Sequence, residues 1–175
     1  KFKFYKTSFT RPLKDSVKEN IFNILMHSSL INIDIKKSKV LDLYSGFGSF
    51  GLECISRGAD LVTFMEKNTK VLNTIKKNLQ NLAIENKAHV IEGEINENLK
   101  KFKREKFNIF FFDPPYKDNE YIDNLRIIRE NNFFSKNHII IVHREKNSYE
   151  NLKLLLNILI IKTYGRSKII FGKFN

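Results

Sequence analysis

Cysteine, proline and tryptophan are nearly missing from this chain of 175 residues, which has one Cys, three Pro and no Trp. The single cysteine, Cys54, excludes a disulfide within the chain and makes a reducing compartment the expected setting. Long apolar runs are also missing. The longest, at residues 152–161, contains a lysine and an asparagine and is too short to span a bilayer. We therefore expect a soluble protein that does not enter a membrane.

Acidic residues are in the minority. Lys and Arg outnumber Asp and Glu by 31 to 19, which gives a formal net charge of +12. Such a surplus favours a polyanionic partner, with nucleic acid as the first candidate. The alternative is a compositional bias, because lysine, asparagine and isoleucine are abundant along the whole chain. The basic runs near the start and at residues 99–106 fit either interpretation.

What the chain does contain is an alternation of strand and helix patterns. With 42% hydrophobic residues and 16 Phe, it can build one core, and we expect a single domain over residues 1–175. A helix is expected near residues 14–25, capped by Asp15 or Ser16. Further helices are expected after the glycine-rich turn, ending near 56–59, and over 71–82. Strands are expected at 39–44, 61–66, 88–93, 107–113 and 138–143, with two more in the tail joined at 164–167. The pattern predicts an α/β fold with a mostly parallel sheet, helices on both faces and a C-terminal antiparallel hairpin.

Three glycines follow the first predicted strand. Gly46, Gly48 and Gly51 form a GxGxxG pattern between a strand and a helix, where the backbone can approach a ligand closely. Glu66 ends the next strand, twenty positions after Gly46, and can accept the ribose hydroxyls of an adenosine-containing ligand. Alone, this pattern fits NAD as well as S-adenosylmethionine, and Glu66 could simply be an acid favoured at a helix start.

Asp42 favours S-adenosylmethionine over NAD. It lies in the first strand, four residues before Gly46. A carboxylate there can face the cationic sulfonium and amino end of S-adenosylmethionine, whereas it would repel the pyrophosphate of NAD.

The stretch FFFDPPY at residues 110–116 predicts a catalytic loop. Pro114 and Pro115 cannot donate hydrogen bonds to a sheet, so they end the strand and leave Asp113 at its carboxyl end, where open α/β sheets bind ligands. Asp113 and a backbone carbonyl of the two prolines can accept the N–H groups of an exocyclic base amine and stabilise the charge that develops on it. Tyr116 offers a ring for stacking the target base. The simpler alternative is a turn that ends a core strand.

Three stretches together resemble one enzyme family. TRPLKDSVKENIFNIL (10–25), VLDLYSGFGSFGLECISRGA (40–59) and FFFDPPY (110–116) resemble the RsmD family of 16S ribosomal RNA guanine-N2 methyltransferases. The resemblance implies a Rossmann-like class I methyltransferase fold with seven strands, S-adenosylmethionine as cofactor, and ribosomal RNA or an assembling small ribosomal subunit as partner. It also implies roles for individual residues: cofactor contacts at Asp42, Gly46, Gly48, Glu66 and Glu94, catalytic contacts at Asp113, Pro114 and Tyr116, and substrate contacts at Arg11, Pro115 and Tyr116, with Pro12 nearby.

Some positions depart from the family pattern. Leu13 and Ser16 replace the usual threonine and arginine, and Phe47 stands in the glycine turn, where it either narrows the cofactor cleft or points into solvent. The family's N-terminal hairpin is short here and the chain starts at Lys1, so we expect a segment upstream. The four histidines are scattered without metal-ligand spacing, and no metal site is expected. Cys54 is expected in the core and Glu53 in a structural pair.

The leading hypothesis is therefore methylation of a guanine amine in small-subunit ribosomal RNA by a monomeric protein. The setting is the cytoplasm, with an organellar matrix as the alternative. Two further hypotheses remain at this point. One is methylation of an adenine amine in DNA or RNA, since DPPY is shared with adenine methyltransferases. The other is an NAD-dependent oxidoreductase or a nucleotide-binding module without catalysis.

Overall fold

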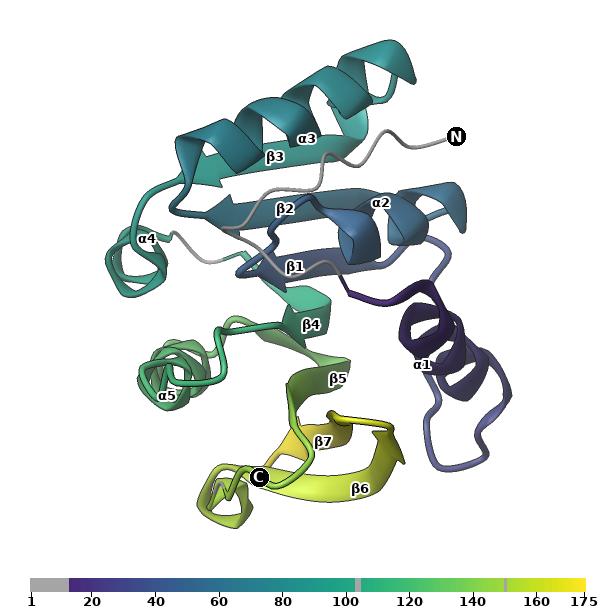
Figure 1. The fold of residues 1–175 in the computed structure, drawn as a ribbon, viewed down its shortest axis with the longest axis vertical. Coiled ribbons are helices and arrows are strands. Elements are labelled where there is room, and N and C mark those ends of the chain that lie inside the picture. The colour runs from purple at the N-terminus through teal and green to yellow at the C-terminus, as the bar shows by residue number, and fades with distance from the viewer. Residues whose placement is uncertain (1–12, 103–104, 150) are drawn as a thin grey trace.

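A computed structural model describes residues 13–102, 105–149 and 151–175. Its centre is a seven-stranded sheet in the order β3-β2-β1-β4-β5-β7-β6 (Figure 1). Strands β1 to β5 run parallel to one another, and β7 runs antiparallel to both β5 and β6. The strands are β1 Lys39–Leu43, β2 Leu61–Glu66, β3 Ala88–Glu92, β4 Phe107–Phe112, β5 Phe134–Glu145, β6 Leu156–Tyr164 and β7 Ser167–Phe174. The expected seven-stranded, mostly parallel sheet with a C-terminal antiparallel hairpin is confirmed.

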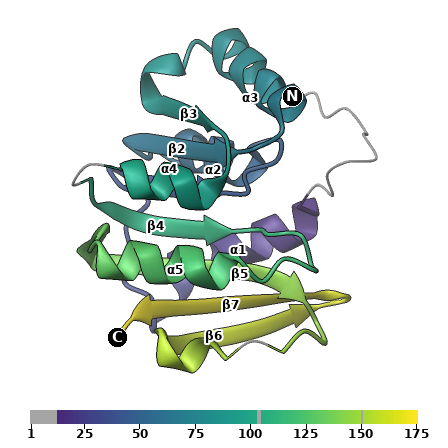
Figure 2. The same cartoon turned by 90° about the vertical axis from the view of Figure 1, so that its left-hand side faces the viewer.

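Helices cover both faces of this sheet. One face packs against α1 Asp15–His27, α2 Ser49–Ser56 and α3 Thr69–Asn81, and the other against α4 Ile95–Lys101 and α5 Tyr121–Glu130. Figure 2 shows α4 and α5 lying across the sheet on the side of the viewer. Two short 3₁₀ helices, η1 Glu85–Lys87 and η2 Leu152–Leu154, precede β3 and β6.

The phenylalanine run of β4 packs into the hydrophobic cores on both faces of the sheet, because successive side chains of a strand point to opposite faces. Phe111 stacks on Phe50 of α2, with ring centroids 4.2 Å apart, while Phe110 and Phe112 join the core beneath α4 and α5. All three are buried, Phe111 at 2% exposed and the other two at 0%. A continuous apolar run is therefore what a central parallel strand requires.

The chain reverses its direction across the sheet between β1 and β4. From β1 it proceeds to β2 and β3 on one side, and then returns to β4 and β5 on the other side. Loops that leave the carboxyl ends of β1 and β4 therefore diverge and leave a crevice between them, which is where open α/β sheets bind ligands.

Local details differ from the expectations. The capping prediction for α1 is wrong: the N-cap is Lys14, without a side-chain cap, and Asp15 is the first helical residue. Asp15 instead pairs with Lys18 at 3.2 Å within the first turn. The strand predicted at 138–143 is longer at both ends: Phe134 pairs with Phe107 across an irregularity in the register, and Arg144 and Glu145 pair with Lys168 and Ser167 of β7. Cys54 lies in the core as expected, and Glu53 pairs with Arg57 at 2.8 Å.

Close packing of α2 on the sheet predicts that Gly51→Ala is destabilising. A Cβ at Gly51 would lie 2.4 Å from Phe64 Cε1 and 2.7 Å from Val62 Cγ1, in a rigid part of the core. We expect a loss of about 1–3 kcal/mol in the free energy of unfolding, as for other overpacked cores. Urea unfolding measures it, with exposed Ser56→Ala at the end of α2 as the control. Equal unfolding midpoints for the two variants would contradict the packing argument.

Candidate active site

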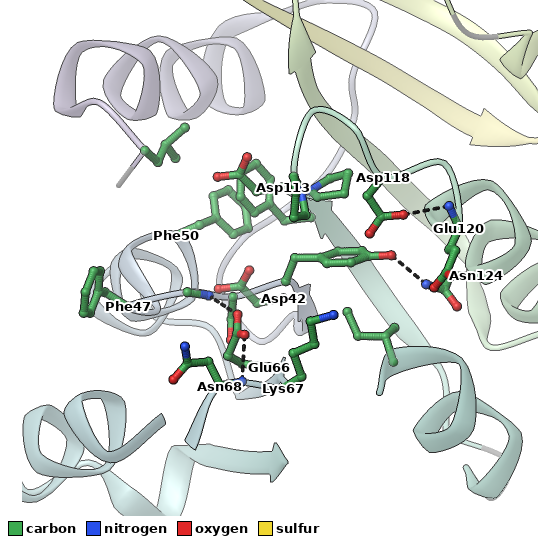
Figure 3. Close-up of a pocket in the computed structure, with 18 of the residues that line it drawn as sticks. Asp42, Phe47, Phe50, Glu66, Lys67, Asn68, Asp113, Asp118, Glu120 and Asn124 are labelled. Atoms are coloured by element: carbon green, nitrogen blue, oxygen red, sulfur yellow. Dashed lines mark hydrogen bonds between the residues drawn. The ribbon is translucent and has the colours of Figure 1, made fainter. Parts of the chain in front are cut away.

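A cavity of about 550 Å³ opens at the carboxyl ends of the central parallel strands. It is lined by the ends of β1, β2 and β4, by the segments that follow β1, β2, β3 and β4, and by the start of α5 (Figure 3). Its lining includes Asp42, Gly46, Glu66, Glu94, Asp113, Pro114, Pro115 and Tyr116. These eight residues were singled out from the sequence, and the fold brings them together around one cavity.

The glycine turn between β1 and α2 is tightly wound. Gly46 and Gly48 have φ values of +52° and +73°, a region that side chains disfavour. Gly48 lies behind the cavity wall, where a Cβ would meet Phe64 and Ile75 at 3.1 and 3.2 Å. Its place in the motif is therefore explained by backbone conformation and packing rather than by a direct ligand contact.

Glu66 fixes this turn from the neighbouring strand. One carboxylate oxygen accepts from the Gly46 N–H and the other from the Asn68 N–H, both at 3.0 Å (Figure 3). Since a carboxylate offers about four acceptor positions, it can still receive ligand hydroxyls after these two bonds. Glu66 is therefore both a brace for the turn and a candidate ribose ligand.

Asp42 is a buried carboxyl group with a hydrogen-bond partner for one of its two oxygens. It is 1% exposed; its Oδ2 accepts from the Gly51 N–H at 3.0 Å, and its Oδ1 has no partner among the described residues. Burial raises the pKa of Asp42 well above its usual range, and the nearby charges of Asp113 and Glu66 raise it further against the Gly51 hydrogen bond. A cationic ligand group beside Oδ1 would offset the cost of burying the charged carboxylate.

The loop after β4 is held by its own backbone groups and by β5. The Pro115 carbonyl accepts from the Asp118 N–H at 2.9 Å and from the Arg144 guanidinium at 3.0 Å. The Tyr116 carbonyl accepts from the same guanidinium at 2.9 Å. These bonds leave the Pro114 carbonyl as the backbone candidate for receiving a substrate amine beside Asp113.

Tyr44 and Asn124, two lining residues of the cavity, connect the end of β1 to α5. The Asn124 amide donates to the Tyr44 hydroxyl at 2.8 Å (Figure 3). Burial is the main cause of a raised pKa at Tyr44, so its hydroxyl stays protonated. Neither residue was anticipated from the sequence.

The cavity is strongly acidic, although the protein as a whole carries +12. Of the described residues that line it, one is a lysine, Lys67, which lies 3.6 Å from the Glu94 carboxylate. Among the described residues, six carboxyl groups line it, from β1, β2, the turn before α4 and the segment between β4 and α5: Asp42, Glu66, Glu94, Asp113, Asp118 and Glu120. This lining suits a ligand with cationic and hydroxyl groups, and it disfavours a pyrophosphate.

Other sequence predictions have mixed outcomes. Phe47 is 5% exposed and lines the cavity, so it narrows the cleft rather than pointing into solvent. Leu13 also lines the cavity. Arg11 and Pro12 lie outside the described residues. Over the described ranges, no group of three His, Cys, Asp or Glu residues has a metal-binding arrangement, and no helix is long and apolar enough to cross a membrane.

Sequence reasoning missed His143 and Arg144 at the end of β5. His143 Nδ1 lies 2.8 Å from Asp113 Oδ1, and Arg144 reaches two carbonyls of the loop after β4. A signal was present, because two polar residues follow the apolar run IIIV in the strand next to β4. The pair lies beside Asp113 only because β5 is the neighbour of β4 in the sheet, and the sequence did not give that strand order.

Comparisons with known proteins point to one group. A family model described as "Conserved hypothetical protein 95" matches residues 1–173. The chain is 38% identical over 139 residues to Ribosomal RNA small subunit methyltransferase D of Haemophilus influenzae, an alignment that covers 78% of this chain and 69% of that protein. It is 33% identical to the enzyme of the same name from Buchnera aphidicola, over 94% of this chain and 80% of the relative. Among solved structures, the Haemophilus influenzae protein HI0767 superposes with a TM-score of 0.77 at 34% identity, over 94% of this chain and 92% of that one.

The buried state of Asp42 generates a prediction about pH and stability. Because burial raises its pKa above the usual 3.8, the folded state keeps a proton that the unfolded chain has lost once the pH passes that value. The contribution of Asp42 to stability therefore declines as the pH rises, until the folded-state carboxyl has ionised as well. Asp42→Asn should abolish this decline and raise the melting temperature at neutral pH, by about 2–4 °C for each kcal/mol gained.

The same variant should bind S-adenosylmethionine more weakly, by roughly tenfold or more, since it loses a charged partner for the cationic end of the cofactor. Calorimetric titration checks the affinity and thermal unfolding at several pH values checks the stability. Asp60→Asn, an exposed acid before β2, is the control and should change neither. Unchanged cofactor affinity in Asp42→Asn would show that the carboxylate does not face the cofactor.

Proposed function

This chain belongs to the Conserved hypothetical protein 95 family, the RsmD family, and on that premise we propose that it methylates the exocyclic N2 amine of a guanine in small-subunit ribosomal RNA. It is a methyltransferase that uses S-adenosylmethionine, and its relatives from two bacteria are named as small-subunit ribosomal RNA methyltransferases. The choice of guanine and of its N2 atom is the proposal. We further propose that the protein acts as a monomer.

The observation that carries the proposal is the acidic cavity at the β1–β4 crevice, with the Asp113–Tyr116 loop as one wall. In a protein of charge +12, carboxylates gathered in one place indicate a local ligand rather than the overall composition. An NAD-dependent activity fits this lining poorly, because the pyrophosphate at the glycine turn would lie close to the Asp42 carboxylate.

The residues present fit S-adenosylmethionine, which supplies a methyl group on a cationic sulfur. Glu66 would hold the ribose, Asp42 would face the cationic end, and Glu94 with Ile95 would lie against the adenine at the end of β3. The strongest sign of fit is Asp42 Oδ1, which has no partner among the residues that the structure describes, since a buried carboxylate oxygen without a partner is costly unless a ligand satisfies it.

Asp113 and Pro114 would prepare the substrate amine. The lone pair of an exocyclic amine is delocalised into the base, which makes the nitrogen a poor nucleophile. If the Asp113 carboxylate and the Pro114 carbonyl accept its two N–H bonds, the lone pair can turn toward the methyl group. Positive charge then develops beside fixed acceptors, which stabilise the transition state more than the ground state. Tyr116 would stack on the base after it has left its helix.

Mass spectrometry of nucleosides identifies the substrate. RNA is incubated with the protein and isotope-labelled S-adenosylmethionine, and then digested to nucleosides. We expect the label in N2-methylguanosine, with naked 16S ribosomal RNA and small ribosomal subunits tested side by side. Label in N6-methyladenosine would favour the adenine alternative, which shares the DPPY motif. Absence of label from every nucleoside, with the cofactor bound, would overturn the proposal.

Replacing Asp113 tests the chemical step. Asp113→Asn keeps an acceptor for His143 and the shape of the side chain but removes the charge, so the fold and cofactor affinity should persist. We expect methyl transfer to fall by at least about 10²-fold, as when one preorganised hydrogen-bond partner is lost elsewhere. Single-turnover kinetics isolates this step from RNA binding. Asp123→Asn, on the exposed side of α5, serves as control, and equal rates in the two variants would refute a role for Asp113.

A further inference from the structure

We propose that His143 and Arg144, the adjacent polar residues at the end of β5, are positioning residues for methyl transfer. His143 orients the Asp113 carboxylate, and Arg144 holds the backbone of the loop that carries Pro115 and Tyr116. This inference rests on the proposed function, because it assigns these two residues to the same reaction.

The sheet register places His143 beside Asp113. Phe112, the last residue of β4, pairs with Val142 of β5. Because the two strands are parallel, Asp113, which follows Phe112, comes to lie beside His143, which follows Val142. The His143 side chain is 2% exposed, and its Nδ1 lies 2.8 Å from Asp113 Oδ1. The ring edge of His143 also faces Tyr116, with centroids 6.4 Å apart and planes at 78°. One buried imidazole therefore contacts both functional side chains of the loop.

This contact determines which oxygen of Asp113 is left for the substrate. An ionised carboxylate only accepts hydrogen bonds, so Nδ1 of His143 must be the donor. The bond occupies Oδ1 and fixes the plane of the carboxylate, and Oδ2 remains for the amine. The Asp113 side chain is 18% exposed, so it is accessible from the cavity, whereas the imidazole behind it is not. Without the imidazole, the carboxylate could rotate about two side-chain bonds.

Arg144 secures the next part of the same loop. Its side chain is among the largest that are fully buried, at 2% exposed for the residue. Two guanidinium nitrogens donate to the carbonyls of Pro115 and Tyr116, at 3.0 and 2.9 Å, and the group lies 4.7 Å above the ring of Tyr121. Burying a guanidinium is costly unless its donors are satisfied, and here the acceptors belong to the loop that contacts the substrate. The planar fork of arginine suits two adjacent carbonyls better than a lysine would.

A purely structural role predicts different behaviour from a positioning role. If His143 merely stabilised the end of β5, its removal would lower stability and leave the rate per folded molecule unchanged. If it acts through Asp113, the rate of methyl transfer must fall while cofactor affinity stays constant. The effect must also vanish when Asp113 no longer carries its charge.

The first experiment compares His143→Phe with His143→Asn. Phenylalanine keeps the ring and loses the donor, whereas asparagine places an amide N–H near the position of Nδ1. Under single-turnover conditions with saturating RNA, we expect His143→Phe to lose roughly 10- to 100-fold in rate, as expected for a misplaced catalytic group, and His143→Asn to recover most of the loss. Calorimetry should show unchanged binding of S-adenosylhomocysteine in both.

His138→Phe is the matched control. His138 lies on the same strand, is 5% exposed, and makes two hydrogen bonds, to the Ser135 carbonyl at 2.8 Å and from the Phe174 N–H at 3.0 Å. These contacts are at the opposite end of β5, away from the cavity lining. The variant should lose stability and keep its rate per folded molecule. A rate loss equal to that of His143→Phe would overturn the positioning role.

The second experiment is a double-mutant cycle. In an Asp113→Asn background, His143→Phe should reduce the rate no further, because the group through which it acts is already impaired. Independent, multiplicative losses would overturn the proposal.

The third experiment needs no substrate and therefore separates this proposal from the proposed function. Arg144→Lys should speed amide hydrogen exchange in residues 116–120, including the Asp118 N–H that bonds the Pro115 carbonyl, whereas His138→Phe should not. If the wild-type protein methylates no RNA, the function proposed above fails while this measurement still reports on the loop. Unchanged exchange in Arg144→Lys would overturn the role of Arg144.

Discussion

A buried carboxylate beside a helix N-terminus is the constraint on which this site depends. Asp42 lies within β1 and accepts the Gly51 N–H of α2, so the strand, the glycine turn and the helix are fixed to one another. Its second oxygen has no partner in the described part of the chain, and burial disfavours its charge. A half-paired buried carboxyl group lowers the stability of the protein. A cationic ligand that pairs with Asp42 would account for its presence in the site.

The distribution of charge over the whole protein also favours a cationic ligand in the cavity. The protein is strongly basic, yet the cavity collects carboxylates from the ends of β1, β2 and β4 and from the loops that follow β3 and β4. The basic exterior suits a polyanionic RNA, and the acidic interior suits the cationic cofactor and the amine of a target base. Under the proposed function, this separation of charge would let the protein attract RNA without binding phosphate in the cavity.

Contacts between neighbouring strands hold the walls of the cavity in place. Glu66 at the end of β2 braces the glycine turn after β1, and His143 and Arg144 at the end of β5 brace the loop after β4. In both cases a side chain from one parallel strand fixes the backbone or carboxylate of the next strand. Parallel order makes this possible because all carboxyl ends meet at one edge of the sheet.

The sequence by itself determined the fold class, a mostly parallel seven-stranded sheet with a C-terminal antiparallel hairpin, and eight of the residues that line the cavity, among them Asp42, Glu66 and Asp113. Local patterns carry that information: apolar runs, a glycine turn and two prolines that end a strand. Only the tertiary structure decided that His143 and Arg144 contact the loop after β4, because their partners are 28 to 30 residues away in the chain and meet them only through the β4–β5 register. It also decided that Phe47 faces the cavity, since the direction of a side chain in a turn depends on the packing around it and not on local sequence.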